Sequence, residues 1–474
     1  MEQGRKSFTV EDQVHFARLS GDVNPMHMDA NFARRTQMGA PVVHGVHGVL
    51  WALEEICRRE SPDLNALKVN FSGPVYVGDA ATAVLGKRSG SQLRVQVQVD
   101  GATATTITLG LGEPARGSVP VVSAPEGPNW PKEPIPLKLE EMRGRSGAIE
   151  FATSESEIAE AFPALSSCIS PRRVAAVAAL SRVVGMICPG MHSIFSGFSL
   201  AFTGDAAGNR LEYATTEIDE RFRMVRLTVA GGGIEGELTA LARIPPVAQP
   251  TIYEVAAAVA PTAYAGDAVL VVGGSRGLGE VTAKACAAGG ARVFITYATG
   301  HTEANKVVEE IRAFGGECEA LPLDVRGDVA AQLSRLPVAP SHLYYYATGP
   351  IAQRRTKLLS QEVLAEFMRF YATGFVETVE ALRAMRADAQ LNVFYPSSVA
   401  VNDTPKGWLE YAMAKAAGEI VCREIGTNLP NVRVLCARLP RILTDQTANV
   451  RATEAAPIIE VIMPIVRDLH EASR

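Results

Sequence analysis

The sequence predicts two kinds of fold in succession: an α+β region with antiparallel strands, and an α/β region with a doubly wound parallel sheet. Three observations carry this prediction. Residues 46–57 read as one buried apolar helix, and strand-like runs such as the alternating 93–99 follow it. The same succession returns in weaker form between residues 171 and 244. From residue 267 onward, continuous apolar strands alternate with helices, as a parallel sheet covered on both faces requires.

The bulk composition favours a soluble cytoplasmic enzyme. A length of 474 residues suggests about three domains, and a net charge of −5 lacks the basic face that nucleic-acid binding calls for. No apolar stretch approaches the roughly 20 residues needed to span a bilayer, and the polar start of the chain shows no signal peptide. The seven cysteines form no C-x-x-C pair, so we expect free thiols, and no metal site is predicted.

The first candidate site is the segment GDVNPMH at residues 21–27. It places a carboxylate, Asp22, and an imidazole, His27, on a turn that Gly21 and Pro25 keep out of helix and strand. Such a pair can act on a water molecule from two sides, because one group takes a proton while the other gives one. Taken alone, the segment is equally compatible with a polar surface turn that carries an Asx-type cap.

A longer pattern surrounds this turn. Residues 16–29 read FARLSGDVNPMHMD, and Phe-Ala at 32–33 and His-Gly at 44–45 follow. The stretch resembles the (R)-specific enoyl-CoA hydratases of the MaoC-like hotdog family, whose signature is roughly F-x-x-x-[ST]-G-D-x-N-P-x-H-x-D. The resemblance implies that Asp22 and His27 are catalytic, and that the buried helix is wrapped by an antiparallel sheet.

The thioester oxygen of such a substrate needs hydrogen-bond donors. Backbone N–H groups at the start of the buried helix, near Gly45 and Gly48, are the expected oxyanion hole, and Asn24 is assigned to the same substrate-contacting set. Which of Asp22 and His27 performs which proton transfer stays open.

A second half of the same kind is expected after a linker rich in Pro, Gly and Ser. The Phe-Ser-Gly at 195–197 echoes the Phe-Ser-Gly at 71–73, and no G-D-x-N-P-x-H segment accompanies it. We therefore expect a catalytic hotdog at residues 1–115 and a degenerate one at 137–247, which completes the sheet and shapes the acyl tunnel. The first part of the fold is thus an α+β double hotdog.

The final region, predicted at residues 267–474 behind a linker at 248–266, contains a second constellation. A glycine-rich loop at 273–279 joins a strand to a helix, where backbone N–H groups and the helix N-terminus can hold a diphosphate. Further on, three residues stand in the spacing S-x12-Y-x3-K: Ser398, Tyr411 and Lys415.

The chemistry explains these residue types. A free tyrosine has a pKa of about 10, and a neighbouring ammonium lowers it by stabilising the phenolate. Because Tyr411 and Lys415 lie four residues apart, they share one helix face. Tyr411 can then protonate a carbonyl oxygen as hydride arrives, while Ser398 donates a hydrogen bond to the same oxygen. A surface Tyr and Lys without a joint role is the alternative.

These residues resemble the short-chain dehydrogenase/reductase superfamily, closest to the 3-oxoacyl-ACP reductase type, with a Rossmann-type doubly wound parallel sheet. The resemblance implies NADP(H) as cofactor. It assigns eleven residues to cofactor binding: Gly273, Ser275, Arg276, Gly277, Leu278, Gly279, Asp324, Val325, Thr444 and, with them, the catalytic Tyr411 and Lys415. NADP is favoured because the second strand ends at Thr296 or Tyr297 rather than at an acid, and because Arg276 lies in the loop.

The sequence also departs from that family. Tyr371 aligns with the tetrad asparagine, which puts a proton relay through that asparagine in doubt, and Arg441 replaces a glycine. The family's last sheet strand, which usually builds the tetramer interface, has no counterpart after the helix expected at 455–469. A homo-oligomer is expected, with a dimer favoured over the tetramer.

Together these features predict a bifunctional enzyme. It reduces a 3-oxoacyl thioester with NADPH and dehydrates the 3-hydroxyacyl product to the trans-2-enoyl thioester, in fatty-acid or polyketide-type biosynthesis. The carrier, CoA or an acyl carrier protein, is left open. Three alternatives remain: the reverse, β-oxidation-like direction; a hotdog region that only binds the thioester; and a degenerate reductase region that acts as a scaffold.

Overall fold

The structure is a computed structural model that describes residues 2–113, 131–204, 208–351, 358–387, 389–445 and 455–471. The chain forms two compact units that divide between Pro245 and Pro246. Each unit has its own hydrophobic core and its own sheet, antiparallel in the first and parallel in the second. Most of the linker expected between the two hotdog halves lies outside the described residues.

The first unit is built on one ten-stranded sheet, in the order β1-β3-β4-β5-β2-β7-β10-β9-β8-β6. Its strands are β1 (Glu2–Ser7), β2 (Leu64–Phe71), β3 (Ala80–Ser89), β4 (Gln92–Val99), β5 (Ala102–Leu111), β6 (Ser146–Glu150), β7 (Ser193–Phe202), β8 (Arg210–Asp219), β9 (Met224–Gly231) and β10 (Ile234–Ala242). Read outward from the central β2–β7 pair, both halves have the same order of strands. The sheet therefore has the repeated, antiparallel organisation that the sequence predicted.

The two halves join without a break in the sheet. In the antiparallel β2–β7 pair, Val69 lies opposite Phe198 and Lys68 opposite Ser199. Gly197 permits this approach, because a side-chain carbon there would lie 2.4 Å from the Val69 carbonyl oxygen. The Phe-Ser-Gly echo noted in the sequence thus falls at the seam of the sheet.

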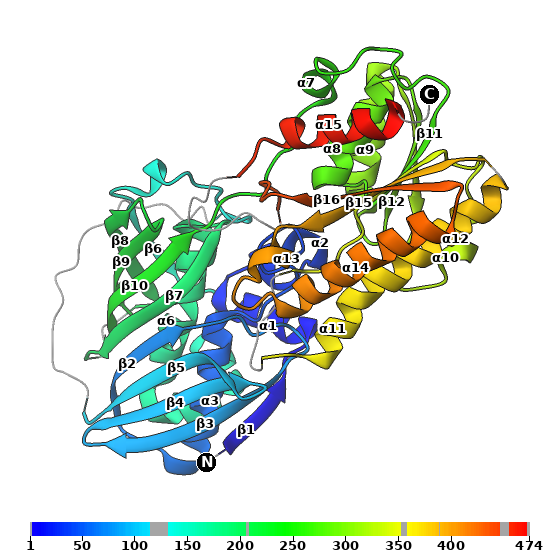
Figure 1. The fold of residues 1–474 in the computed structure, drawn as a ribbon. Coiled ribbons are helices and arrows are strands. Elements are labelled where there is room, and N and C mark those ends of the chain that lie inside the picture. Colours follow the sequence, from blue (N-terminus) through cyan, green and yellow to red (C-terminus); the bar gives the residue numbers. More distant parts are fainter. Residues whose placement is uncertain are drawn as a thin grey trace. The chain divides into compact units, whose positions relative to one another are not determined.

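Helices fill the concave side of this sheet (Figure 1). They are α1 (Val10–Ser20), the 3-10 turn η1 (Pro25–His27), α2 (Ala30–Ala33), α3 (Gly45–Glu60), η2 (Glu140–Met142), α4 (Glu155–Ala161), α5 (Pro163–Ile169), α6 (Pro171–Arg182) and the π-helical turn η3 (Val183–Ile187). The long helices α3 and α6 contact each other, and most of the residues in each helix are buried, as apolar runs of this length predict.

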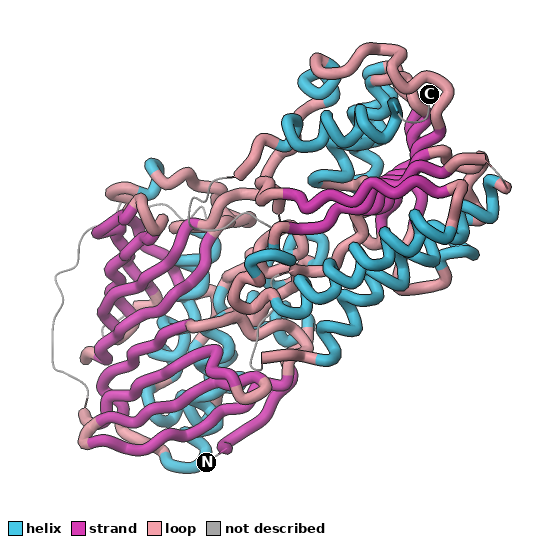
Figure 2. The backbone as a smooth tube through the Cα atoms, in the orientation of Figure 1, coloured by secondary structure: helices cyan, strands magenta, loops and turns pink. Residues whose placement is uncertain are grey.

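The second unit has a six-stranded parallel sheet in the order β13-β12-β11-β14-β15-β16, the doubly wound order of a dinucleotide-binding fold. The strands are β11 (Ala268–Val272), β12 (Arg292–Tyr297), β13 (Glu317–Pro322), β14 (His342–Tyr345), β15 (Leu391–Ser398) and β16 (Val432–Leu439). Figure 2 shows them stacked in one twisted layer between helices. In the described residues no strand follows β16.

The helices of the second unit are α7 (Ile252–Ala256), α8 (Gly277–Ala288), α9 (His301–Phe314), α10 (Val329–Leu333), α11 (Gln361–Met368), the π-helical turn η4 (Arg369–Thr373), α12 (Gly374–Arg386), α13 (Ala400–Asp403), α14 (Leu409–Asn428) and α15 (Ile458–Glu471). The expected linker at 248–266 is ordered here, because α7 packs on α8 and buries Ile252 and Val255.

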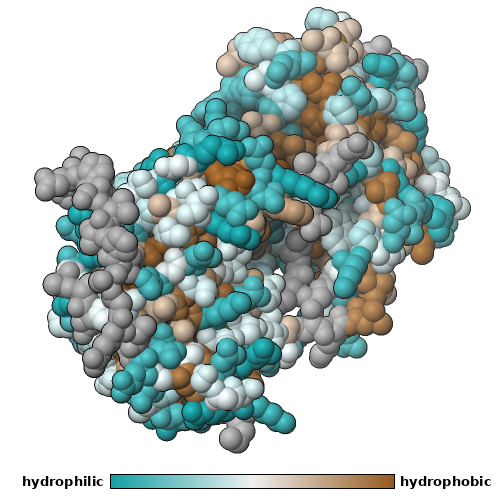
Figure 3. Space-filling model, turned by 90° about the vertical axis from the view of Figure 1, so that its left-hand side faces the viewer, coloured by the Kyte–Doolittle hydropathy of each residue, from teal (hydrophilic) through white to brown (hydrophobic). Residues whose placement is uncertain are grey.

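On the face drawn in Figure 3, hydrophilic and hydrophobic residues are interspersed. In the part of the chain that the structure describes, no helix combines the length and the apolarity that crossing a bilayer requires.

Candidate active sites

The first candidate site begins where α1 ends. Gly21 caps this helix in the left-handed conformation, with φ at 74°, and its N–H donates to the Ala17 carbonyl. The chain then turns inward, so that Asp22 is only 1% exposed. The glycine of the motif therefore serves to send the carboxylate into the interior.

Both oxygens of the Asp22 carboxylate accept hydrogen bonds. The Ser181 hydroxyl donates to Oδ2 over 2.6 Å, and the Asn24 backbone N–H donates to Oδ1 over 3.1 Å. Burial raises the pKa of Asp22, while the nearby His27 and the Ser181 hydrogen bond act in the opposite direction. The net direction of the pKa is upward from the ordinary value of an aspartate.

His27 lies in η1, close to that carboxylate. Its Nδ1–H donates to the Val42 carbonyl over 2.7 Å, which leaves Nε2 as the free lone pair of a neutral ring. Burial lowers the pKa of His27, against the opposing effect of Asp22. A carboxylate oxygen of Asp22 and ring nitrogens of His27 and His44 lie within 4.8 Å of one another.

His44 is the neighbour that holds His27 in place. The two rings stack with their centroids 3.7 Å apart. The ring nitrogens of His44 lie 3.0 Å from Gln13 Oε1 and 3.1 Å from the Asp22 carbonyl oxygen. The sequence had placed His44 only within the motif, whereas the structure makes it part of the site.

The Asn24 side chain links its own turn to the second half of the sheet. Its side-chain Nδ2 donates to the Gly185 and Met191 carbonyls, and its Oδ1 accepts from the Met26 N–H that opens η1. These contacts fix the turn against the second half of the sheet. They leave the predicted donation from Asn24 to a substrate without support among the observed contacts.

The two glycines expected at the start of α3 differ in whether their backbone N–H groups are already hydrogen-bonded within the helix. The Gly48 N–H already donates to the His44 carbonyl over 3.2 Å, which is the first hydrogen bond of the helix. The amides before it, Gly45 among them, are the ones that a helix leaves unused. Gly45 also packs tightly, because a side-chain carbon there would lie 2.9 Å from the Phe71 ring.

The second half of the sheet reaches directly into this site. Ser181 lies in the last turn of α6, near Asp22, although the two are 159 residues apart. Gly185, in η3, lies so close that a side-chain carbon there would be 2.5 Å from both carboxylate oxygens. From the sequence, this half was expected only to complete the sheet and shape the acyl tunnel. Ser181 and Gly185 could not be predicted as site residues, because a lone Ser and Gly in an apolar helix carry no motif.

The second candidate site lies at the carboxyl edge of the parallel sheet. Gly273 has φ at 77°, and Gly279 permits a tight loop, because a side-chain carbon there would lie 2.3 Å from the Gly273 carbonyl oxygen. Thr296, at the end of β12, holds the loop through hydrogen bonds to the amides of Gly273 and Gly274. The loop opens directly into α8, whose first turn can face a diphosphate.

Ser398, Tyr411 and Lys415 come together as their spacing predicted. Ser398 is the last residue of β15, and its side chain hydrogen-bonds the Tyr411 hydroxyl. Burial raises the pKa of Tyr411, and this hydrogen bond acts in the opposite direction. Lys415, one turn further along α14, donates from Nζ to the Pro396 carbonyl over 2.7 Å. Burial lowers the pKa of Lys415 to about 7. The ammonium lies 5.9 Å from the centre of the Tyr411 ring.

The other residues predicted to contact the cofactor lie at several places in the second unit. Thr444 lies beside Gly277, with 3.6 Å between its Cγ2 and a side-chain carbon built on that glycine. The carboxylate of Asp324 accepts from the Arg326 side chain, and this contact lowers its pKa. Arg276 points to Asp445, with 3.8 Å between Nη1 and Oδ2. Ser275 and Val325 are buried, and Leu278 packs on the core.

Comparison with family models assigns both units. Residues 2–108 match the model of the MaoC like domain, and residues 267–455 match that of the short chain dehydrogenase. The first unit therefore carries a hydratase/dehydratase domain, and the second an oxidoreductase domain.

Individual relatives agree with this division. The chain is 30% identical over 215 residues to a 3-oxoacyl-[acyl-carrier-protein] reductase of Synechocystis sp., which covers 44% of this chain and 85% of that protein. It is 32% identical over 79 residues to a 3-hydroxybutyryl-CoA dehydratase of Methylorubrum extorquens, covering 16% of this chain and 50% of the relative. A peroxisomal hydratase-dehydrogenase-epimerase of Saccharomyces cerevisiae is 34% identical over 71 residues, covering 15% of this chain and 8% of its own length.

The extent of the match to the Synechocystis reductase settles the family of the second unit. The chain belongs to the short chain dehydrogenase family and carries a MaoC like domain ahead of its reductase domain.

Proposed function

We propose that this chain is a bifunctional enzyme that reduces a 3-oxoacyl thioester with NADPH and dehydrates the resulting 3-hydroxyacyl thioester to the trans-2-enoyl thioester. One observation carries the proposal: a single chain holds both a buried carboxylate–imidazole pair and an assembled Ser–Tyr–Lys constellation. The product of the reduction is the substrate of the dehydration, so the two sites act in sequence.

In the reductase site, Tyr411 supplies the proton and Ser398 orients the carbonyl oxygen that receives it. Lys415 favours the phenolate that Tyr411 becomes after the proton has left. The glycine-rich loop and the first turn of α8 fit the diphosphate of a nicotinamide dinucleotide, which supplies the hydride. NADPH is proposed over NADH because β12 ends in Thr296 and Tyr297 rather than in a carboxylate that would take the ribose hydroxyls.

In the dehydratase site, the pair removes one proton from the substrate and supplies another. Burial favours the form in which the Asp22 carboxyl holds a proton and His27 is neutral. In that form the carboxyl is the acid and His27 Nε2 is the base. The amides at the start of α3, with Gly45, are the proposed donors to the thioester oxygen.

The direct test replaces the pair while the reductase residues stay intact. The double variant Asp22→Asn, His27→Ala should still oxidise NADPH with a 3-oxoacyl thioester, but should accumulate the 3-hydroxyacyl thioester. We expect enoyl formation to fall by at least about 100-fold, because general acid–base groups contribute about 10² to 10⁴ each. Unchanged dehydration would support a hotdog unit that only binds the thioester.

The reverse direction is a second candidate, and the similarity to the hydratase-dehydrogenase-epimerase of yeast favours it. In that case the first unit hydrates an enoyl thioester and the second oxidises the product. Initial rates with NAD and NADP, measured in both directions, separate the two. A clear preference for NAD in oxidation would favour the reverse direction.

The carrier of the acyl group is the remaining part of the proposal. Parallel assays with CoA-bound and carrier-protein-bound 3-oxoacyl substrates, read by mass spectrometry, decide between the two. No turnover of the carrier-bound form would remove the biosynthetic version. The dimer expected from the sequence stays a prediction.

A further inference from the structure

Tyr371 takes a place in the reductase site that the family gives to an asparagine. It lies in the π-helical turn η4, between α11 and α12, and its side chain is 1% exposed. Turns of this type recur at functional sites because the extra residue redirects a side chain. Here the redirected residue is aromatic, so it cannot offer the amide that the family uses.

The ring of Tyr371 lies against the catalytic lysine. The Nζ atom of Lys415 is 4.0 Å from the centre of the Tyr371 ring, nearer than to the rings of Tyr395, at 5.1 Å, and Tyr411, at 5.9 Å. Such a distance places the ammonium within the range of a cation–π interaction. Among the described partners of Lys415 no carboxylate is found, and its hydrogen bond goes to the neutral Pro396 carbonyl.

The ring is held there by contacts on several sides. The Tyr371 hydroxyl hydrogen-bonds Thr348 Oγ1, and its carbonyl accepts from the Tyr395 hydroxyl over 2.9 Å. The ring also meets Tyr411 edge-on, with centroids 5.5 Å apart at 88°. Gly418 leaves room for this arrangement, because a side-chain carbon there would lie 2.7 Å from the Tyr371 carbonyl oxygen.

We propose that Tyr371 is a positioning residue of the reductase site, whose ring face stands in for the family's asparagine by keeping the Lys415 ammonium charged and beside Tyr411. The inference rests on the proposed reductase function and names how that site is controlled. A buried ammonium has lost most of its water, so a nearby π face is one of the few groups left to favour its charge. The role is electrostatic, and it needs the ring rather than the hydroxyl.

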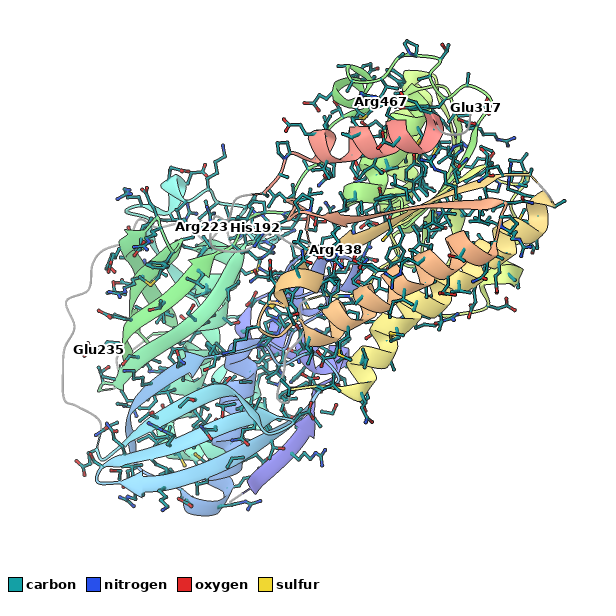
Figure 4. All side chains as sticks on the ribbon, viewed as in Figure 1. His192, Arg223, Glu235, Glu317, Arg438 and Arg467 are labelled. Carbon is teal, nitrogen blue, oxygen red and sulfur yellow. The ribbon has the colours of Figure 1, made fainter. Side chains whose placement is uncertain are left out.

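The surroundings of Lys415 define what else can influence its charge. The titratable groups that face it are, besides Tyr371, the phenols and thiols of Tyr395, Tyr411, Cys422 and Cys436. Glu419 shares a pocket with these thiols, but its carboxylate is occupied by Arg438, which Figure 4 labels on β16. Loss of the Tyr371 ring should therefore lower the pKa of Lys415, because no carboxylate replaces it.

The test compares variants of the full chain that separate the ring from the hydroxyl. Tyr371→Phe keeps the ring, and Tyr371→Met removes it while filling much of its volume. The rate of NADPH oxidation is measured against pH with a saturating 3-oxoacyl thioester. The alkaline limb of kcat should stay in place for Tyr371→Phe and move down by about half to one pH unit for Tyr371→Met. KM should change less than kcat.

A second measurement is independent of turnover. The pKa of Lys415 is read by ¹³C NMR of protein labelled at the lysine Cε, and the resonance is assigned with Lys415→Arg. The value should be lower in Tyr371→Met than in the wild type and unchanged in Tyr371→Phe. Equal values in all three proteins, or a shift in Tyr371→Phe as large as in Tyr371→Met, would overturn the proposal. A wild type that titrates as expected but reduces no 3-oxoacyl thioester would refute the proposed function alone.

Discussion

Gly185 sets the tightest limit on the dehydratase site. A side-chain carbon at this position would be 2.5 Å from both oxygens of the Asp22 carboxylate, so either that carboxylate or η3 must move. The contact also explains why the second half of the sheet matters: it supplies the wall against which Asp22 is positioned, and Ser181 supplies a hydrogen bond to it.

The variant Gly185→Ala should therefore lose dehydration while NADPH oxidation continues. A displacement of about 1 Å at a catalytic group can cost about 100-fold in rate, and we expect a loss of this order in kcat. Gly73→Ala is the matched control in the same unit, because nothing lies within 4 Å of a side-chain carbon there. Wild-type dehydration by Gly185→Ala would show that the second half does not shape the site.

The residues of both sites differ in how far the sequence could predict them. The dyad and the Tyr–Lys pair depend on local spacing, five and four residues, and the structure brings each together. Ser181 and Gly185 meet Asp22 only through the packing of one half on the other. The Tyr371 contact depends on a π-helical turn, and no residue type marks such a turn in advance.

The helix α15 contacts the amino-terminal edge of the parallel sheet, which is the edge opposite the reductase site. Its His470 Nδ1 lies 2.7 Å from Asp267 Oδ2, just before β11, and its ring stacks on His342 at 4.0 Å. His342 opens β14 and is 1% exposed. Burial, with repulsion from His470, lowers the pKa of His342 to about 4.

This buried histidine should make the second unit sensitive to acid. The unfolded chain binds the proton near pH 6.5, whereas the folded unit binds it only near pH 4, so the unfolded state takes up more protons in between. The stabilisation is present above pH 6.5 and is lost as pH falls, by about 2 kcal/mol between pH 6.5 and 5 at 1.36 kcal/mol per unit. Urea unfolding at both pH values measures it.

The control variants are judged by how steeply the free energy of unfolding changes with pH, and not by the free energy itself. His342→Gln should flatten the dependence on pH, whatever it does to stability at pH 7. His301→Gln, at an exposed histidine of α9, should leave the slope as in the wild type. A slope that persists unchanged in His342→Gln would assign the acid sensitivity to another group.

The elements themselves were largely predictable, because each follows from a local pattern. Alternation marked β4, and continuous apolar runs marked α3 and β11. Differences arise where tertiary contacts decide. The apolar helix expected from residue 171 becomes α6 and η3, where Gly185 lies against Asp22, and β1 forms by pairing with β3 despite its polar sequence.

The chain joins two compact units, and each of them holds one of the two candidate sites. Because the described residues named for each site come from a single unit, the two activities should be separable by mutation. Tyr411→Phe should abolish NADPH oxidation, since the phenol proton is lost, and leave the conversion of 3-hydroxyacyl to enoyl thioester at its wild-type rate. A coupled loss of both activities in an assay of each step would contradict this independence.

We propose that reduction and dehydration follow each other on one acyl group. The most direct measurement supplies an unlabelled 3-oxoacyl thioester and NADPH with deuterium at both C4 positions, and analyses the products by mass spectrometry. The hydride enters at C3, and dehydration removes the C3 hydroxyl with a C2 proton. We therefore predict an enoyl thioester that carries one deuterium at C3. The proposed sequence would be contradicted if, with both the CoA-bound and the carrier-bound substrate, no NADPH were consumed and no labelled enoyl product were formed.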